Sequence, residues 1–239
     1  MGLYLIGLGL NKNSMTKEAL EALKTCDEIY LEKYTTDFPY SPKELEESYN
    51  IKITEIGREK IEDESILEKA KERNIALLVY GDVLSATTHV QLLIAAKKQK
   101  INFKIFHNSS ILTAISDTGL QLYKFGKIAS IPAWQKSYTP ESFIDYIKQN
   151  QKIKAHTLLL VDVGLELKDV KKQIKIASKN KKLKLGKVIL CSQLGTENQK
   201  IIYDSLENLP DKIKKPFCLI IPSELHFVEK EALETKLVG

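Results

Sequence analysis

The sequence predicts an α/β protein whose sheets are mainly parallel. Short apolar runs with strand composition alternate along the whole chain with longer amphipathic or charged segments, a pattern typical of strands and helices that follow one another in turn. The 239 residues are 43% hydrophobic and 28% charged and include only 11 glycines and 7 prolines, so a buried core is expected. This length is sufficient for two domains of ordinary size.

In the first half of the chain, strands are expected to alternate with helices. The expected strands, where large apolar and β-branched residues gather, are residues 3–9, 28–31, 51–56, 76–80 and 103–106. The expected helices, where apolar residues recur at helical spacing, are residues 17–25, 42–49, 64–73, 88–98 and 111–117. The first helix is preceded by Ser14 and Thr16, either of which can cap its N-terminus.

The second half repeats this alternation. Its expected strands are residues 127–131, 157–161, 187–191 and 217–221. Its expected helices are residues 140–149, 168–177, 198–206 and 228–234. Between the halves, a Thr-Gly pair and a Lys-Phe-Gly turn interrupt the periodicity around residues 119–126. We therefore expect two α/β domains, residues 1–120 and 121–239.

The net charge of +5 comes from one segment. Residues 166–187 contain nine lysines and two acidic residues, so the rest of the chain is slightly acidic. Among 36 basic residues only Arg58 and Arg73 are arginines, the side chain that reads guanine edges and holds phosphates through two parallel bonds. Sequence-specific nucleic-acid binding is therefore not expected. The lysine-rich segment is expected either to steer an acidic protein partner or only to face water.

The apolar runs are too short for a membrane protein. None approaches the roughly 20 residues that a spanning helix needs, and no basic segment precedes the apolar residues 1–10. We therefore expect a cytoplasmic protein that begins with a buried strand. Three isolated cysteines, Cys26, Cys191 and Cys218, are expected to fill the core, and the four scattered histidines indicate no metal site.

Candidate ligand-binding residues follow three of the expected strands. Open α/β sheets bind ligands beyond the carboxyl ends of their strands, and Gly7-Leu8-Gly9-Leu10, Gly81-Asp82 with residues 83–89, and residues 107–111 lie in such positions. Each segment also has an ordinary explanation, because aspartate, serine and threonine commonly cap turns and helices. Together the three segments are stronger evidence for a site than any one of them alone.

The glycines after the first strand allow one alternative, a dinucleotide-dependent oxidoreductase. Gly7 and Gly9 form part of a dinucleotide fingerprint, and Glu32 follows about 20 residues later, where an acid would bind a ribose hydroxyl. The third glycine is missing, however, and the helix begins only after residues 11–16. Both departures count against this alternative.

Several stretches carry a resemblance to a known family. They are residues 3–10, Gly81 to His89, Ser110-Ile111, Gly119-Leu120, Tyr123-Lys124-Phe125-Gly126, His156-Thr157-Leu158 with Asp162, and Leu225-His226 with Glu229. In this order they resemble the diphthine synthases, which belong to the tetrapyrrole-methylase-like class of methyltransferases. The Ala-Thr-Thr-His and Tyr-Lys-Phe-Gly blocks are the most specific, because they separate this family from the porphyrin and corrin methylases.

The resemblance implies two α/β domains with S-adenosyl-L-methionine in the cleft between them, usually in a homodimer. It implies translation elongation factor 2 as the protein substrate, methylated on the amine of its modified histidine. The number of methyl groups stays open, because the archaeal type ends at a trimethylammonium product and the eukaryotic type also esterifies the carboxylate. Methylation of a tetrapyrrole precursor at carbon is the alternative within the same class.

Carried over residue by residue, the resemblance assigns eight cofactor contacts. They are Leu10, Asp82, Ser85, Ser110 and Ile111 in the first domain and Val161, Leu194 and Cys218 in the second. The chain departs from the family at Val83 and Ser109, where proline is usual, and at Phe217, where histidine is common. No catalytic acid or base is assigned, because methyl transfer to an amine depends mainly on positioning; the histidines are expected to be structural.

Overall fold

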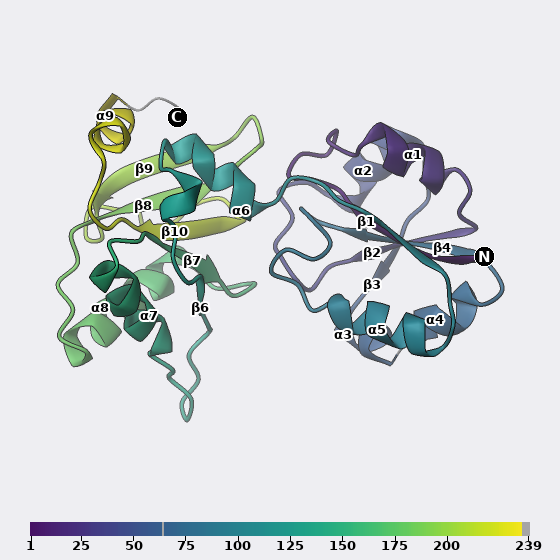
Figure 1. The fold of residues 1–239 in the computed structure, drawn as a ribbon, viewed down its shortest axis with the longest axis horizontal. Helices are drawn as coiled ribbons and strands as arrows, with labels where there is room; N and C mark the ends of the chain where they lie inside the picture. The colour runs from purple at the N-terminus through teal and green to yellow at the C-terminus, as the bar shows by residue number, and fades with distance from the viewer. Residues whose placement is uncertain (64, 236–239) are drawn as a thin grey trace. The chain divides into compact units, whose positions relative to one another are not determined.

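The computed structural model describes residues 1–63 and 65–235 of the chain. Contacts divide the chain into two units, Met1–Leu112 and Thr113–Gly239, and each contains one five-stranded sheet (Figure 1). The domain boundary expected from the sequence, after residue 120, lies a few residues beyond this division at Leu112, and it stays a prediction. None of the described helices is long and apolar enough to cross a membrane.

The sheet of the first unit is parallel throughout, with strand order β3-β2-β4-β1-β5. Its strands are β1 (Gly2–Gly7), β2 (Glu28–Glu32), β3 (Thr54–Ile56), β4 (Asn74–Val79) and β5 (Phe103–Phe106). Its helices are α1 (Lys17–Leu23), α2 (Pro42–Tyr49), α3 (Arg58–Glu62), α4 (Ser65–Ala70) and α5 (Val90–Lys98). Because the strands are parallel, their carboxyl ends all lie at one edge of the sheet.

Helices cover both faces of this first sheet (Figure 1). Successive side chains of a strand point to opposite faces, so Leu5 and Leu77 pack in the cluster with α3, α4 and α5, whereas Ile6 and Leu78 pack in the cluster with α1 and α2. This double coverage explains why β1 and β4 are apolar at consecutive positions rather than at alternate ones. Full burial of each such side chain contributes about 1.5–3 kcal/mol.

The sheet of the second unit is mixed, with strand order β6-β7-β10-β8-β9. Its strands are β6 (Ala129–Ile131), β7 (Thr157–Val161), β8 (Lys187–Ser192), β9 (Lys200–Ser205) and β10 (Phe217–Ile221). β6 and β7 pair in parallel, and the other pairs are antiparallel. The expectation of a mainly parallel sheet is therefore wrong for this unit. Residues 193–199 are too few for the crossover of a dozen or more residues that a parallel β8–β9 pair would need.

The helices of the second unit are α7 (Ser142–Lys152), α8 (Leu167–Asn180) and α9 (Phe227–Thr235), and α6 (Ile111–Ala114) begins at its boundary. Figure 1 shows α7 and α8 on the face of the sheet opposite to α9. Phe143 and Ile147 of α7 and Ile174 of α8 are fully buried in one cluster with Leu190 and Leu219 of the sheet. The two helices therefore supply most of the core on that face.

Two of the expected helices are corrected by the structure. Residues 198–206 contain strand β9 rather than a helix, because Ile201, Ile202 and Tyr203 have β-branched or aromatic side chains and pair with β8. The helix expected at 64–73 ends at Ala70, and the additional short helix α3 precedes it; residue 64 lies outside the described residues. The other expected elements are confirmed within a few residues of their bounds.

Cys191 and Cys218 are neighbours that the sequence did not place together. They are register partners on β8 and β10, and both are free and buried. The hydrogen bond with the adjacent Cys218 thiol, together with burial, raises the pKa of Cys191 well above its usual value. Both thiols therefore fill the core as expected, whereas Cys26 is only half-buried.

Candidate functional site

Three loops of the first unit meet at the carboxyl edge of its sheet. β4, β1 and β5 are adjacent, so the segments that follow them come together: Leu10 after β1, Asp82 and Ser85 after β4, and Ser110 and Ile111 after β5. Leu10, Asp82 and Ser110 are buried, and Ser85 and Ile111 are half-buried. The five first-domain residues assigned to a cofactor therefore share one edge.

Asp82 joins the loop after β4 to the loop after β5. Its Oδ1 accepts from the Leu84 amide at 3.0 Å and from the Ser85 hydroxyl at 3.1 Å. Its Oδ2 accepts from His107 Nδ1 at 2.7 Å and from the Asn108 amide at 3.1 Å. Burial alone would raise the pKa of Asp82, but these four hydrogen bonds outweigh it and hold the pKa below its usual value. The carboxylate is therefore ionised and fully used as an acceptor by the chain.

Asn108 ties the third loop to the first, a role that sequence analysis did not assign. Its Nδ2 donates to the carbonyl of Gly7 at 3.0 Å and to that of Ser14 at 2.8 Å. Its Oδ1 accepts from the Ser109 amide at 2.8 Å, a bond that the proline usual at this position cannot make. An asparagine directly after a strand is the available signal, because its amide commonly bonds nearby backbone.

Backbone contacts bring the loops after β1 and β4 together at two glycines. Gly9 and Gly81 exchange amide-to-carbonyl hydrogen bonds of 3.0 and 2.9 Å, both at positive φ. The Tyr80 hydroxyl donates to the Leu10 carbonyl at 3.2 Å. A Cβ added at Gly81 would lie 3.7–3.9 Å from Ser109, Ser110 and Leu10, so this glycine leaves a space the size of a methyl group bordered by two of the assigned residues.

The three second-domain residues assigned to a cofactor also share one sheet edge. Val161 ends β7 and Cys218 lies near the start of the antiparallel neighbour β10, where its register partners are Leu160 and Cys191. Leu194 follows the end of β8 and is buried. Beside it, the Gln193 amide donates to the Pro216 carbonyl at 2.8 Å, which holds the turn against the segment before β10.

A buried ionic network connects three segments elsewhere in the second unit. Glu229 is fully buried and accepts from Lys124 Nζ, from the amides of Gln121 at 2.9 Å and His226 at 2.7 Å, and from His156 Nε2 at 3.1 Å. Burial alone would raise the pKa of Glu229, but these hydrogen bonds outweigh it and lower the pKa to about 2. The Tyr-Lys-Phe-Gly block, the segment at His156 and the segment at Glu229 therefore converge on one carboxylate.

The histidines have different surroundings. His156 is fully buried, donates through Nε2 to Glu229, and accepts at Nδ1 from the Ser223 amide at 3.0 Å. His89 is buried, with Nδ1 3.1 Å from the Val83 carbonyl, and burial lowers the pKa of both rings. His226 is exposed beside Phe227. Both buried rings are therefore neutral parts of the packed structure.

Comparison with known proteins identifies the family. The model of the tetrapyrrole (corrin/porphyrin) methylases matches residues 2–210. The diphthine synthase of Methanococcus maripaludis is 36% identical over 248 aligned positions, which cover 97% of this chain and 97% of that protein. The chain belongs to the diphthine synthases, within the tetrapyrrole methylase family. A crystal structure of a diphthine synthase superposes with a TM-score of 0.88 at 32% identity, covering 98% of this chain and 94% of the other.

Some relatives in the diphthine synthase family are longer proteins. The diphthine methyl ester synthase of Schizosaccharomyces pombe is 44% identical over 166 residues, which are 68% of this chain but 59% of the relative. The human protein of the same name is 41% identical over 176 residues, which are 72% of this chain and 62% of the relative. The match thus spans about three fifths of these relatives.

Proposed function

We propose that this chain is an S-adenosyl-L-methionine-dependent methyltransferase that methylates the amine of the modified histidine of translation elongation factor 2, in diphthamide biosynthesis. The observation that carries the proposal is the match to a diphthine synthase over 97% of both chains. A homodimer and a cytoplasmic location belong to the same proposal. Methylation of a tetrapyrrole precursor is not favoured, because the curated relatives described above are diphthine or diphthine methyl ester synthases.

Two features of the described residues fit such a cofactor. The first is the space beside Gly81, which any larger side chain would fill and which Leu10 and Ser110 border. The second is Gln193 Oε1, which is buried next to Leu194 and has no hydrogen-bond partner among the described residues. A buried acceptor without a donor is costly, and an amino or hydroxyl group of a ligand would relieve that cost.

The contribution of the chain to the reaction is positioning. When bound, the cofactor supplies an activated methyl group on a sulfonium centre. Asp82 and Asn108 hold three loops in one arrangement through hydrogen bonds of 2.7–3.1 Å, so the residues that border the cofactor are set before it binds. Holding reactants in line lowers the barrier without an acid, a base or a covalent intermediate on the protein.

The amine must lose a proton before it accepts a methyl group. An ordinary α-amino group has a pKa of about 8, so about a tenth of it is already neutral at pH 7. His156 has both ring nitrogens engaged and His89 is buried with a lowered pKa, so we assign neither as a general base. Water is sufficient to take the proton.

The first test combines calorimetry with mass spectrometry. We expect purified protein to bind S-adenosyl-L-methionine in a titration calorimeter. We also expect it to shift the mass of elongation factor 2 that carries the unmethylated intermediate by a whole number of methyl units. Elongation factor 2 without the intermediate is the matched control and should not change. Absence of both cofactor binding and a mass shift would reject the proposal.

An ester is a second possible product. The fission yeast and human relatives, at 44% and 41% identity, are named diphthine methyl ester synthases, whereas the 36% identical archaeal relative is named diphthine synthase. Three transfers to nitrogen give three methyl units, and a further transfer to the carboxylate gives a fourth. Mild alkaline treatment distinguishes them, because it hydrolyses an ester and leaves methyl groups on nitrogen. Loss of one unit after treatment identifies the ester.

A further inference from the structure

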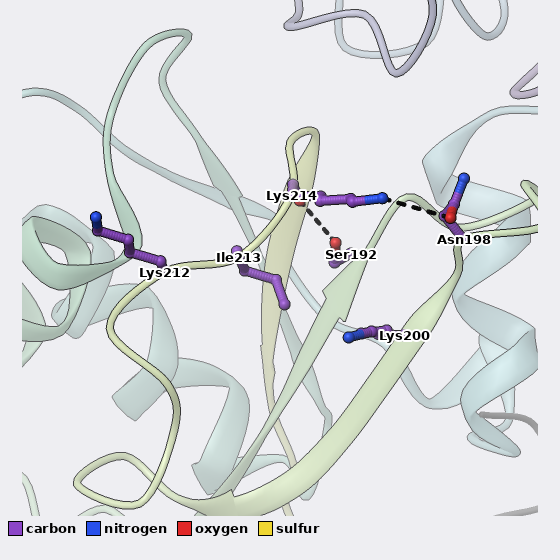
Figure 2. A pocket seen from close by; sticks show the side chains of 6 residues that line it. All are labelled: Ser192, Asn198, Lys200, Lys212, Ile213 and Lys214. Atoms are coloured by element: carbon purple, nitrogen blue, oxygen red, sulfur yellow. Dashed lines mark hydrogen bonds between the residues drawn. The ribbon is translucent and has the colours of Figure 1, made fainter.

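A pocket of about 370 Å³ in the second unit is lined by lysines, two neutral polar residues and one isoleucine. Its lining residues are Ser192, Asn198, Lys200, Lys212, Ile213 and Lys214, which come from the end of β8, the start of β9 and the segment before β10 (Figure 2). The volume is within the range of ordinary ligand sites. Three lysines and no carboxylate line it.

These lysines differ from their neighbours in having no acidic partner. Lys215 pairs with Glu166 at 2.7 Å and Lys171 pairs with Asp211 at 2.9 Å. Among the described residues, by contrast, no carboxylate lies within 4.0 Å of the ammonium groups of Lys200, Lys212 and Lys214, and Lys214 donates to Asn198 Oδ1 at 3.4 Å. The positive charge in the pocket is therefore available to a ligand.

The wall of the pocket is held in place by the end of β8. Ser192 is buried and its hydroxyl donates to the Lys214 carbonyl at 2.6 Å. The side-chain amide of Gln193 donates to the Lys215 carbonyl at 2.7 Å, and its backbone amide donates to the Pro216 carbonyl at 2.8 Å. Three hydrogen bonds thus fix the segment that carries Ile213 and Lys214, so the pocket is formed before any ligand binds.

The arrangement of the charges favours an extended ligand. In Figure 2, Ile213 lies between Lys212 on one side and Lys200, Lys214 and Asn198 on the other. A peptide with two acidic side chains can contact the lysines on both sides of Ile213 at once. Lysines act as separate point charges rather than as a planar fork, and separate point charges can each pair with one carboxylate of a peptide. The apolar surface of Ile213 suits an aliphatic side chain between the two acids.

We propose that this pocket binds an acidic peptide segment of a protein partner. If the proposed function is correct, that partner is the protein that carries the methyl-accepting histidine, and the pocket holds it next to the edge where Leu194 lies. Charge complementarity of this kind increases the rate of association and fixes the orientation of a partner, with little effect on the chemical step.

The binding test uses fluorescein-labelled hexaglutamate, with hexaglutamine as the neutral control peptide. We expect fluorescence anisotropy to detect hexaglutamate binding, and we expect Lys200→Glu with Lys212→Glu to weaken it by about tenfold or more. The matched control is Lys97→Glu with Lys98→Glu on α5, two exposed lysines with the same change of charge. Equal weakening by both pairs, or full displacement of the peptide by inorganic phosphate, would overturn the proposal.

A kinetic test then links the pocket to the proposed function. Lys200→Glu with Lys212→Glu should raise the KM for elongation factor 2 by about tenfold, with kcat and the affinity for S-adenosyl-L-methionine unchanged. An unchanged KM would overturn the assignment of the pocket to this partner. The two proposals fail in different ways. Peptide binding without methyl transfer would reject the methyltransferase, whereas methyl transfer without peptide binding would reject the pocket.

Discussion

Asp82 accepts four hydrogen bonds from the chain, so its first role is to hold the loops of the site rather than to contact a cofactor. The family resemblance assigns it to the cofactor, yet both carboxylate oxygens are already engaged by residues 84, 85, 107 and 108. A carboxylate in this position acts first on the loops, because it sets the spacing between the end of β4 and the end of β5. Asp82 then affects cofactor binding indirectly, through the positions of the two loops.

Replacement of Asp82 tests this role. Asp82→Asn keeps the shape but turns an amide NH₂ toward donors, so we expect a loss of about 1–3 kcal/mol of unfolding free energy and weaker binding of S-adenosyl-L-methionine. Ser85→Ala removes a single donor to the same carboxylate and should have a smaller effect on the unfolding free energy and on the affinity for S-adenosyl-L-methionine. Urea unfolding and titration calorimetry measure the two quantities. Unchanged stability together with lost binding would instead show a direct contact with the cofactor.

Glu229 links the stability of the second unit to pH. Its pKa is about 2 in the folded protein and about 4.5 in the unfolded chain. Because the folded pKa is the lower one, the carboxylate contributes stability that is complete above about pH 4.5 and is lost as the pH falls toward 2. The buried ring of His156, whose pKa is lowered from 6.5, acts in the same direction at somewhat higher pH.

The variant Glu229→Gln should show this dependence. Near pH 7 we expect it to lose about 3–5 kcal/mol of unfolding free energy, because Lys124 keeps its charge without the carboxylate. Below about pH 4.5 the difference from the parent protein should shrink. Glu224→Gln, which removes an exposed pair with Lys154, is the control and should cost less than about 1 kcal/mol. A difference that stays constant with pH would contradict the assignment.

At the scale of elements, strand β9 shows that the spacing of apolar residues within one segment is not always sufficient to tell a strand from a helix. Residues 198–206 have apolar residues in positions that fit one turn of a helix, but they include β-branched and aromatic residues that pair with β8, with Ile189 opposite Tyr203 and Leu190 opposite Ile202. Strand pairing is a contact between segments, so its stabilisation does not appear in the spacing of a single segment. The longer helices, such as α7 and α8, are predictable because the spacing of apolar residues within one segment already marks the face that they bury.

Helix α8 carries the lysine-rich segment that makes the chain basic. Its inner face, with Val170, Ile174 and Ala177, is fully buried, and Lys172 and Lys175 are exposed on the outer side. This is the distribution of an amphipathic helix whose charges face water. Two other lysines of the segment, Lys171 and Lys181, already pair with acidic residues.

We therefore expect the outer lysines of α8 to affect solubility rather than binding of a partner. Lys172→Glu with Lys175→Glu should leave the KM for elongation factor 2 within about twofold of the parent value, with the same dependence on salt as the parent protein. Initial rates at low and at physiological ionic strength measure this. A large KM increase at low salt would show instead that α8 steers the partner.

At the scale of the whole molecule, the two units were predictable to different degrees. The first is a parallel sheet with helices on both faces, as its alternating strands and helices indicate, and the sequence predicts that the residues after β1, β4 and β5 share one edge. The second unit contains a mixed sheet. The short connection of residues 193–199, rather than the residue pattern, decides that β8 and β9 are antiparallel, whereas β10 pairs with β7 and β8 without following either strand directly.

The amino-acid sequence alone predicts the α/β class, most helices and strands, and the family. These follow from periodicity, turn residues and short motifs, each of which involves only a few neighbouring positions. The folded chain was needed to pair Cys191 with Cys218, to give Asp82 and Glu229 their four donors each, and to gather three lysines around Ile213. These features depend on contacts between residues distant in sequence, where hydrogen bonding and burial select the partner.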